Sequence, residues 1–166
     1  MADAEEFDFG DNVDTATFEQ ILDMDDADED DAHEFSKSIV FGFLDQADST
    51  FAKMETSKYV RPDKSIHVVR TLIHYVLRKD KDLKELSSLG HFLKGSSATL
   101  GFTKVKDECE KIQHYGQKKD ETGATDEPDE EKCLRLIGQS IAKAKTAYDE
   151  VKRLMEQYYA KLEGNA

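Results

Sequence analysis

One histidine in the sequence stands among residues that could carry chemistry. His91 lies in the run LSSLGHFLKGSSATLG, from Leu86 to Gly101. Because each helical residue turns by about 100°, the apolar residues of this run centre near 165° from His91. We therefore expect a helix whose core face points away from the imidazole and leaves it in solvent, where neutral imidazole can act as a nucleophile near pH 7. The predicted core face consists of Leu86, Leu89, Phe92, Leu93 and Leu100.

The residues that share the helix face of His91 suit an anion on its ring. Lys94 follows three residues later and puts a cation where such an anion would lie. Gly95 follows four residues later and leaves space beside the imidazole, although a glycine inside a helix costs about 1 kcal/mol relative to alanine. His91 could therefore attack an aspartyl phosphate presented by another protein and form a phosphoramidate. Such a transfer depends mostly on positioning and charge stabilisation.

The elements that must position this histidine are helices. Apolar residues at three- and four-residue steps predict main helices over about 31–54, 84–100, 103–115 and 134–162. A short helix from Phe18 to Met24, capped by Thr15 or Thr17, comes before them. We predict an all-α fold, a four-helix bundle of up-down-up-down order over residues 14–163 that follows a disordered acidic tail at 1–13. A homodimeric coiled coil of the last helix is the alternative. The bundle is favoured because the other amphipathic helices also have apolar faces that must be buried.

The first main helix carries two apolar features. Phe35 and Ile39 fall roughly 100° from the centre of its core stripe on the helical wheel. Such a pair beside another apolar helix suggests a docking surface. The predicted core stripe itself consists of Val40, Phe43, Leu44, Ala47, Phe51 and Met54.

Composition narrows the classes of function. The chain has 166 residues and a formal net charge of −13, which disfavours nucleic acids and anionic membranes and favours protein partners. No signal peptide or long apolar stretch is apparent. The two cysteines, Cys109 and Cys133, have no disulfide or metal spacing, so an intracellular location is the expectation. The acidic run at 23–35 lacks the glycine and closing glutamate of a calcium loop, and His67 and His74 lack a third metal ligand.

Residues 56–82 form an atypical segment. It breaks at Arg61-Pro62, is basic within an acidic chain, and regains an amphipathic pattern from Ile66 to Leu77. Two explanations remain open for the extra piece at 59–77. It is either a genuine additional helix that packs on the bundle or a short retained intron translated in frame.

The sequence HFLKGSSATLG resembles the phosphoacceptor motif of histidine-containing phosphotransfer (HPt) domains, and especially the fungal phosphorelay intermediates of osmosensing pathways. The segments EQILDMDD, FSKSIVFGFLDQA, CEKIQHYG and KAKTAYDEVKRLMEQYYAKL resemble the corresponding fungal segments in order. The resemblance covers most of residues 15–163 except 56–82. It implies that His91 is phosphorylated, that Lys94, Gly95 and Ser96 lie next to the phosphoryl group, and that Gln113 steadies the imidazole.

The resemblance further implies a docking patch for receiver domains at Phe18, Ile21, Met24, Phe35 and Ile39. Gln117 departs from the pattern, because relatives can carry a basic residue there. Ser96 lies about 140° from His91, which suits packing and local hydrogen bonding better than direct contact with phosphate.

The function that the resemblance implies is that of a phosphorelay intermediate. His91 would accept a phosphoryl group from the receiver-domain aspartate of a hybrid sensor kinase and pass it to aspartates of downstream response regulators. The chain would be a monomeric carrier without kinase activity or cofactor, in the cytoplasm and nucleus, and any magnesium would belong to the partner receiver. A non-catalytic acidic adaptor is the alternative. A hydrolase that uses His91 as a base is a third reading, but the sequence offers no partnered acid.

Overall fold

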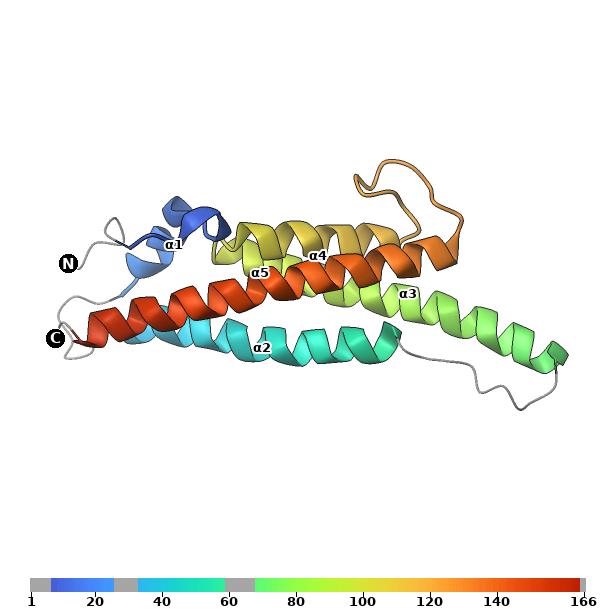
Figure 1. Ribbon diagram of the computed structural model, residues 1–166, viewed down its shortest axis with the longest axis horizontal. Helices are drawn as coiled ribbons and strands as arrows, with labels where there is room; N and C mark the ends of the chain where they lie inside the picture. The colour runs from blue at the N-terminus through green and yellow to red at the C-terminus, as the bar shows by residue number, and fades with distance from the viewer. Residues whose placement is uncertain (1–6, 26–32, 59–67, 165–166) are drawn as a thin grey trace.

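The computed structural model describes residues 7–25, 33–58 and 68–164, with side chains for all of these except 58 and 68–82. A short 3-10 helix, η2 (Gly10–Asn12), and α1 (Thr15–Leu22) precede four long helices. These are α2 (Glu34–Lys58), α3 (Val68–Thr99), α4 (Thr103–Gly116) and α5 (Glu130–Gly164). Successive long helices run in opposite directions, and no strand occurs in the described ranges (Figure 1). The predicted all-α, up-down-up-down bundle with a short N-terminal helix is confirmed.

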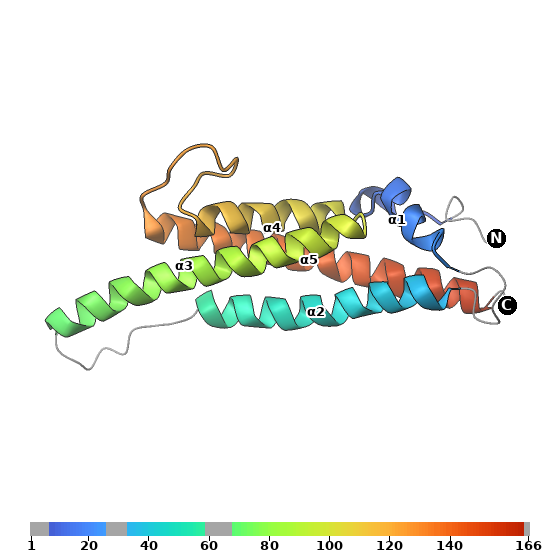
Figure 2. The same cartoon turned by 180° about the vertical axis from the view of Figure 1, so that it is seen from behind.

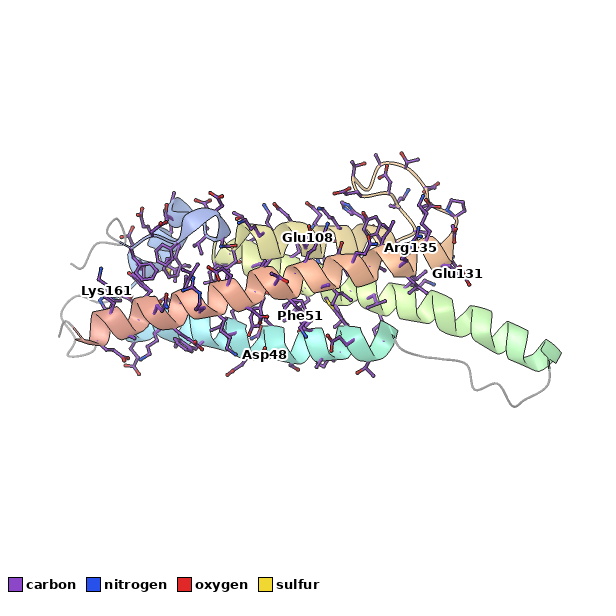
Figure 3. All side chains as sticks on the ribbon, in the orientation of Figure 1. Asp48, Phe51, Glu108, Glu131, Arg135 and Lys161 are labelled. Carbon is purple, nitrogen blue, oxygen red and sulfur yellow. The ribbon has the colours of Figure 1, made fainter. Side chains whose placement is uncertain are left out.

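The core lies between the predicted stripes of the long helices. All six predicted core residues of α2 are buried, and α5 presents a buried stripe from Cys133 to Leu162. Figure 3 shows Phe51 between α2 and α5, where it is buried, whereas Asp48 on the same helix is exposed and pairs with Lys152 of α5. The hydroxyl of Tyr148 donates a hydrogen bond of 3.0 Å to the carbonyl oxygen of Leu44, which ties α5 to α2 inside this apolar core.

The prediction of a disordered tail is wrong for residues 7–13. Phe9 and Val13 are buried, and the ring of Phe9 packs edge-on against Phe18, with 5.5 Å between the centroids. Phe9 also contacts Tyr158 of α5, with centroids 5.2 Å apart. The apolar side chains of this acidic stretch pack into an aromatic cluster. The free energy gained by burying them exceeds the cost of ordering the polar residues around them. Residues 1–6 lie outside the described part.

Two helix starts differ from the predictions. Asp14, rather than a threonine, caps α1, since its carboxylate accepts hydrogen bonds from the backbone N–H and the hydroxyl of Thr17. The helix that carries His91 begins at Val68 and not at Lys84. Its first half, 68–82, extends past the end of α2 (Figures 1 and 2). The part of the atypical segment from Val68 onward is therefore continuous with the histidine helix.

Candidate functional site

The site begins where α3 and α4 approach each other closely. A Cβ on Gly90 would lie 2.9 Å from the carbonyl oxygen of Cys109 and 3.0 Å from the backbone nitrogen of Gln113. A Cβ on Gly116 would lie 2.6 Å from the carbonyl oxygen of Leu83. Only glycine permits these distances without a shift of the backbone. The two glycines thus allow α4 to lie directly against the helix that carries the histidine.

His91 is exposed on α3, as the helical wheel predicts. Its Nδ1 lies 3.3 Å from Oε1 of Gln113 on α4. With the amide oxygen as acceptor, Nδ1 carries the proton and Nε2 keeps its lone pair. The hydroxyl of Ser87 donates a hydrogen bond of 3.0 Å to the carbonyl oxygen of Gln113, which fixes the backbone of that residue. Gln117, one turn further along, is exposed and adds no charge to the site.

The three residues predicted beside the phosphoryl group differ in their contacts. Nζ of Lys94 lies 3.4 Å from Oε1 of Glu110, so the cation is paired across to α4. Gly95 is exposed, and a Cβ there would meet nothing within 4 Å. The hydroxyl of Ser96 donates to the carbonyl oxygen of Phe92 at 2.9 Å, which fits the expected local hydrogen bond. The open space therefore lies over Gly95, with Lys94 at its side.

Large apolar side chains are exposed on three helices or their ends. The exposed fractions are 60% for Met24, which follows α1, 41% for Phe35 on α2 and 49% for Phe92 on α3. Ile21 and Ile39 are half-buried. We call these five residues the apolar surface. The carboxylate of Asp25 accepts a hydrogen bond of 2.7 Å from the backbone N–H of Ser36, which anchors the start of α2 and with it Phe35.

Two sequence predictions about apolar residues are wrong. Phe18 is fully buried in the cluster with Phe9 and Tyr158, so it cannot touch a partner directly. Phe92 is exposed rather than in the core. The mean direction of the five predicted core positions lies closer to Phe92 than the direction of the observed core does. The deeply buried positions of the run, Leu86, Leu93 and Leu100, centre near 200° from His91, about 100° from Phe92.

The described residues hold no group of three or more side chains that could bind a metal ion. The side chains of His67 and His74 lie outside the described part, as do residues 26–32 of the acidic run. Among the described helices, none is long and apolar enough to cross a membrane. Cys109 and Cys133 are free thiols and are both buried.

Comparison with known proteins matches residues 40–158 to the Hpt domain family. The Schizosaccharomyces pombe protein named multistep phosphorelay regulator 1 is 40% identical over 149 residues, which cover 90% of this chain. The Candida albicans phosphorelay intermediate protein YPD1 is 30% identical over 193 residues, which cover 89% of this chain and 92% of that protein. The chain spans only 43% of the length of the S. pombe relative.

Solved structures share the fold. Saccharomyces cerevisiae Ypd1, in a co-crystal with the receiver domain of its downstream response regulator Ssk1, superposes with a TM-score of 0.67 at 25% identity. The match covers 92% of this chain and 98% of Ypd1. A crystal structure of yeast Ypd1p gives a TM-score of 0.64 at 24% identity, with 90% of this chain and 95% of that chain covered. The family match and the C. albicans relative confirm the resemblance, and the chain belongs to the Hpt domain family.

Proposed function

We propose that this protein is a phosphorelay intermediate. His91 takes a phosphoryl group from the receiver-domain aspartate of a hybrid sensor kinase and passes it to the aspartates of downstream response regulators. One observation carries the proposal: the imidazole of His91 is exposed, and its Nδ1 lies 3.3 Å from Oε1 of Gln113, an arrangement that favours the proton on Nδ1 and leaves Nε2 free to attack. The neighbouring Gly95 leaves open space on the same helix. Membership of the Hpt domain family supports it.

The transfer requires one bond to form and one to break. Nε2 of His91 attacks the phosphorus of an aspartyl phosphate, the N–P bond forms, and the P–O bond to the aspartate breaks to leave a carboxylate. The ring gains positive charge as the N–P bond forms, and Oε1 of Gln113 stabilises this charge by accepting a hydrogen bond from Nδ1–H, which keeps its proton. In the reverse direction the ring leaves as neutral imidazole. Lys94 supplies a cation for the transferred group.

The apolar surface is the proposed docking site for receiver domains. It supplies side chains from α1, α2 and α3, and the exposed aromatic rings of Phe35 and Phe92 are the type of residue that anchors interfaces. The yeast Ypd1 that was solved together with a receiver domain has the same fold and supports this class of partner. Relative to the sequence-based prediction, the surface loses Phe18 and gains Phe92.

We further propose that the protein is a carrier without kinase activity, because no nucleotide loop of the GxxxxGK[ST] type occurs in the sequence. Any magnesium would belong to the partner's aspartate pocket. The named fungal relatives support a role in a phosphorelay. We propose that the pathway is an osmosensing one and that the protein acts in the cytoplasm and nucleus.

The test is transfer from a receiver domain whose aspartate carries radiolabelled phosphate. The wild-type chain should gain acid-labile label, and His91→Gln should gain none while its helical content and unfolding midpoint stay close to those of the wild type, because His91 is exposed. Label on the His91→Gln variant would contradict the assignment of the acceptor. A wild-type chain that binds the receiver but gains no label would be a non-catalytic adaptor.

A further inference from the structure

Two pairs of side chains cross from α3 to α4 at the site. Nδ1 of His91 meets Oε1 of Gln113 at 3.3 Å, and Nζ of Lys94 meets Oε1 of Glu110 at 3.4 Å. On each helix the two residues are three positions apart, so the pairs are neighbours along the contact between α3 and α4. Glu110 is therefore a carboxylate held beside the cation that serves the transferred group.

This carboxylate competes with a phosphoryl group for one ammonium. The side chain of Lys94 is 26% exposed and that of Glu110 is 45% exposed, so the ion pair is neither sealed from water nor fully solvated. Such a pair is weak enough to exchange partners. A phosphoryl group on His91 would bring a second anion to the same side of α3, and Lys94 can neutralise only one of the two. The anion that is not paired with Lys94 remains nearby as an uncompensated negative charge.

We infer that Glu110 is a positioning residue that holds Lys94 away from Nε2 of His91 in the unphosphorylated protein. By competing for Lys94, it also weakens the interaction between Lys94 and a phosphoryl group on His91. The inference rests on the proposed phosphotransfer by His91. A relay carrier must release its phosphoryl group as readily as it accepts it. Competition by Glu110 lowers the stability of phosphorylated His91 and so keeps the group transferable.

The experiment is a double-mutant cycle on the transfer equilibrium with one phosphorylated receiver domain. Glu110→Gln should shift the equilibrium toward phosphorylated His91 by roughly two- to five-fold, the range expected for loss of one partly exposed charge contact. In a Lys94→Ala background the same substitution should shift it by less than half as much, because the contested cation is gone. Glu156→Gln removes an equal charge from an exposed position on α5 and should leave the equilibrium unchanged.

Two results would overturn the inference. One is an unchanged equilibrium in Glu110→Gln, and the other is an equal shift with and without Lys94, which would mean that the charge acts without the lysine. Circular dichroism and thermal unfolding of each variant identify a merely structural effect, which would change the unfolding midpoint and not the coupling to Lys94. If the wild-type chain accepts no phosphoryl group, the proposed function fails as well. If it does and Glu110→Gln behaves identically, the inference alone fails.

Discussion

At the scale of single residues, two glycines of α3 have different roles at the site: one permits close packing against α4, and the other leaves space beside the histidine. Gly90 is buried, and a Cβ there would lie 2.9 Å from the carbonyl oxygen of Cys109. Gly95 is exposed, and a Cβ there would meet nothing. The first glycine lets Gln113 reach the imidazole, and the second keeps the approach to His91 open for a partner.

Gly95→Gln is expected to slow phosphoryl transfer without unfolding the protein. Glutamine is a better helix former than glycine by several tenths of a kcal/mol, so the unfolding midpoint should stay or rise. Its side chain, however, would occupy the space next to the imidazole and the incoming receiver domain. Rapid-quench transfer rates check this, with Gly95→Ala as the control that adds only a methyl group. Equal rates for Gly95→Gln and wild type would assign Gly95 no part in the approach.

The two cysteines should resist alkylation in the native protein. Burial raises the pKa of the Cys109 thiol to about 12 and that of Cys133 above its usual range. Because the thiolate is the reactive form, both thiols remain protonated and shielded at pH 8. Mass spectrometry after iodoacetamide treatment should find neither cysteine modified in buffer and both modified in urea. Fast labelling of the native chain would contradict the packing of α4 and α5.

Part of the site could be predicted from the sequence. The exposure of His91 and the position of Lys94 follow from the turn per residue of a helix, and the residue types indicate phosphoryl chemistry. The pairing of Lys94 with Glu110 could not be predicted, because it depends on how closely α4 lies against α3. That distance is set by Gly90, whose role no helical wheel reveals.

At the scale of the elements, one face of α2 packs in the core and another face carries residues of the apolar surface. Val40 and Met54 belong to a stripe that is fully buried, whereas Phe35 is exposed and Ile39 half-buried on another side. The cap that Asp25 forms on the backbone of Ser36 holds the start of this helix. Packing and docking can therefore be perturbed separately in one helix.

Phe35→Ala and Ile39→Ala are expected to weaken receiver binding more than they weaken folding. Loss of an apolar anchor in a docking surface can cost about 1 kcal/mol or more of binding free energy. Isothermal titration with a receiver domain measures the free energy of binding, and urea denaturation measures the free energy of unfolding. A large loss of stability with unchanged affinity would place both side chains in the core instead.

The matched control on a neighbouring element is Phe18→Ala. Because Phe18 is fully buried, its truncation should cost about 3–5 kcal/mol of folding free energy. The fraction that remains folded should bind the receiver with nearly the affinity of the wild type. This contrast separates the exposed members of the apolar surface from the aromatic cluster beneath α1.

Most helices could be predicted from the sequence, because a long amphipathic stripe determines both that the segment is helical and which of its faces is buried. The six stripe residues predicted for α2 are all buried, and the apolar stripe of α5 is buried from Ile137 to Leu162, whereas Leu134 is only partly buried. The N-terminal stretch was missed because Phe9 and Val13 are isolated apolar residues among acids, and only the assembled cluster with Tyr158 gives them a place to bury. The amphipathic pattern at 66–77 can be recognised in the sequence, but its continuity with the histidine helix cannot, because the charged run from Arg78 to Lys84 between the two apolar patterns shows no apolar stripe of its own.

At the scale of the whole molecule, the described part of the core comes from both sides of the atypical segment. The buried core residues identified come from residues 9–54 and 83–162. The half of α3 that precedes Leu83 projects beyond α2 (Figures 1 and 2).

Deletion of residues 59–77 is therefore expected to preserve both folding and phosphotransfer. Lys58 would be joined to Arg78, and the part of α3 that packs on α4 would keep its full length. Thermal unfolding and the transfer assay check the two expectations, with a Gly-Ser linker of equal length in place of 59–77 as the control. If the deletion unfolds the protein while the linker version does not, the length of the connection matters. If both unfold, the segment belongs to the bundle.

The measurement that tests the central claim most directly is the identification of the phosphorylated atom. The chain is phosphorylated by a receiver domain, and phosphorus–nitrogen and phosphorus–proton couplings are recorded by NMR on 15N-histidine-labelled protein. The account predicts one phosphoramidate, on Nε2 of His91, with the proton on Nδ1 held by Gln113. Phosphorus on Nδ1 of His91, on another histidine such as His114, or on no histidine at all would contradict it.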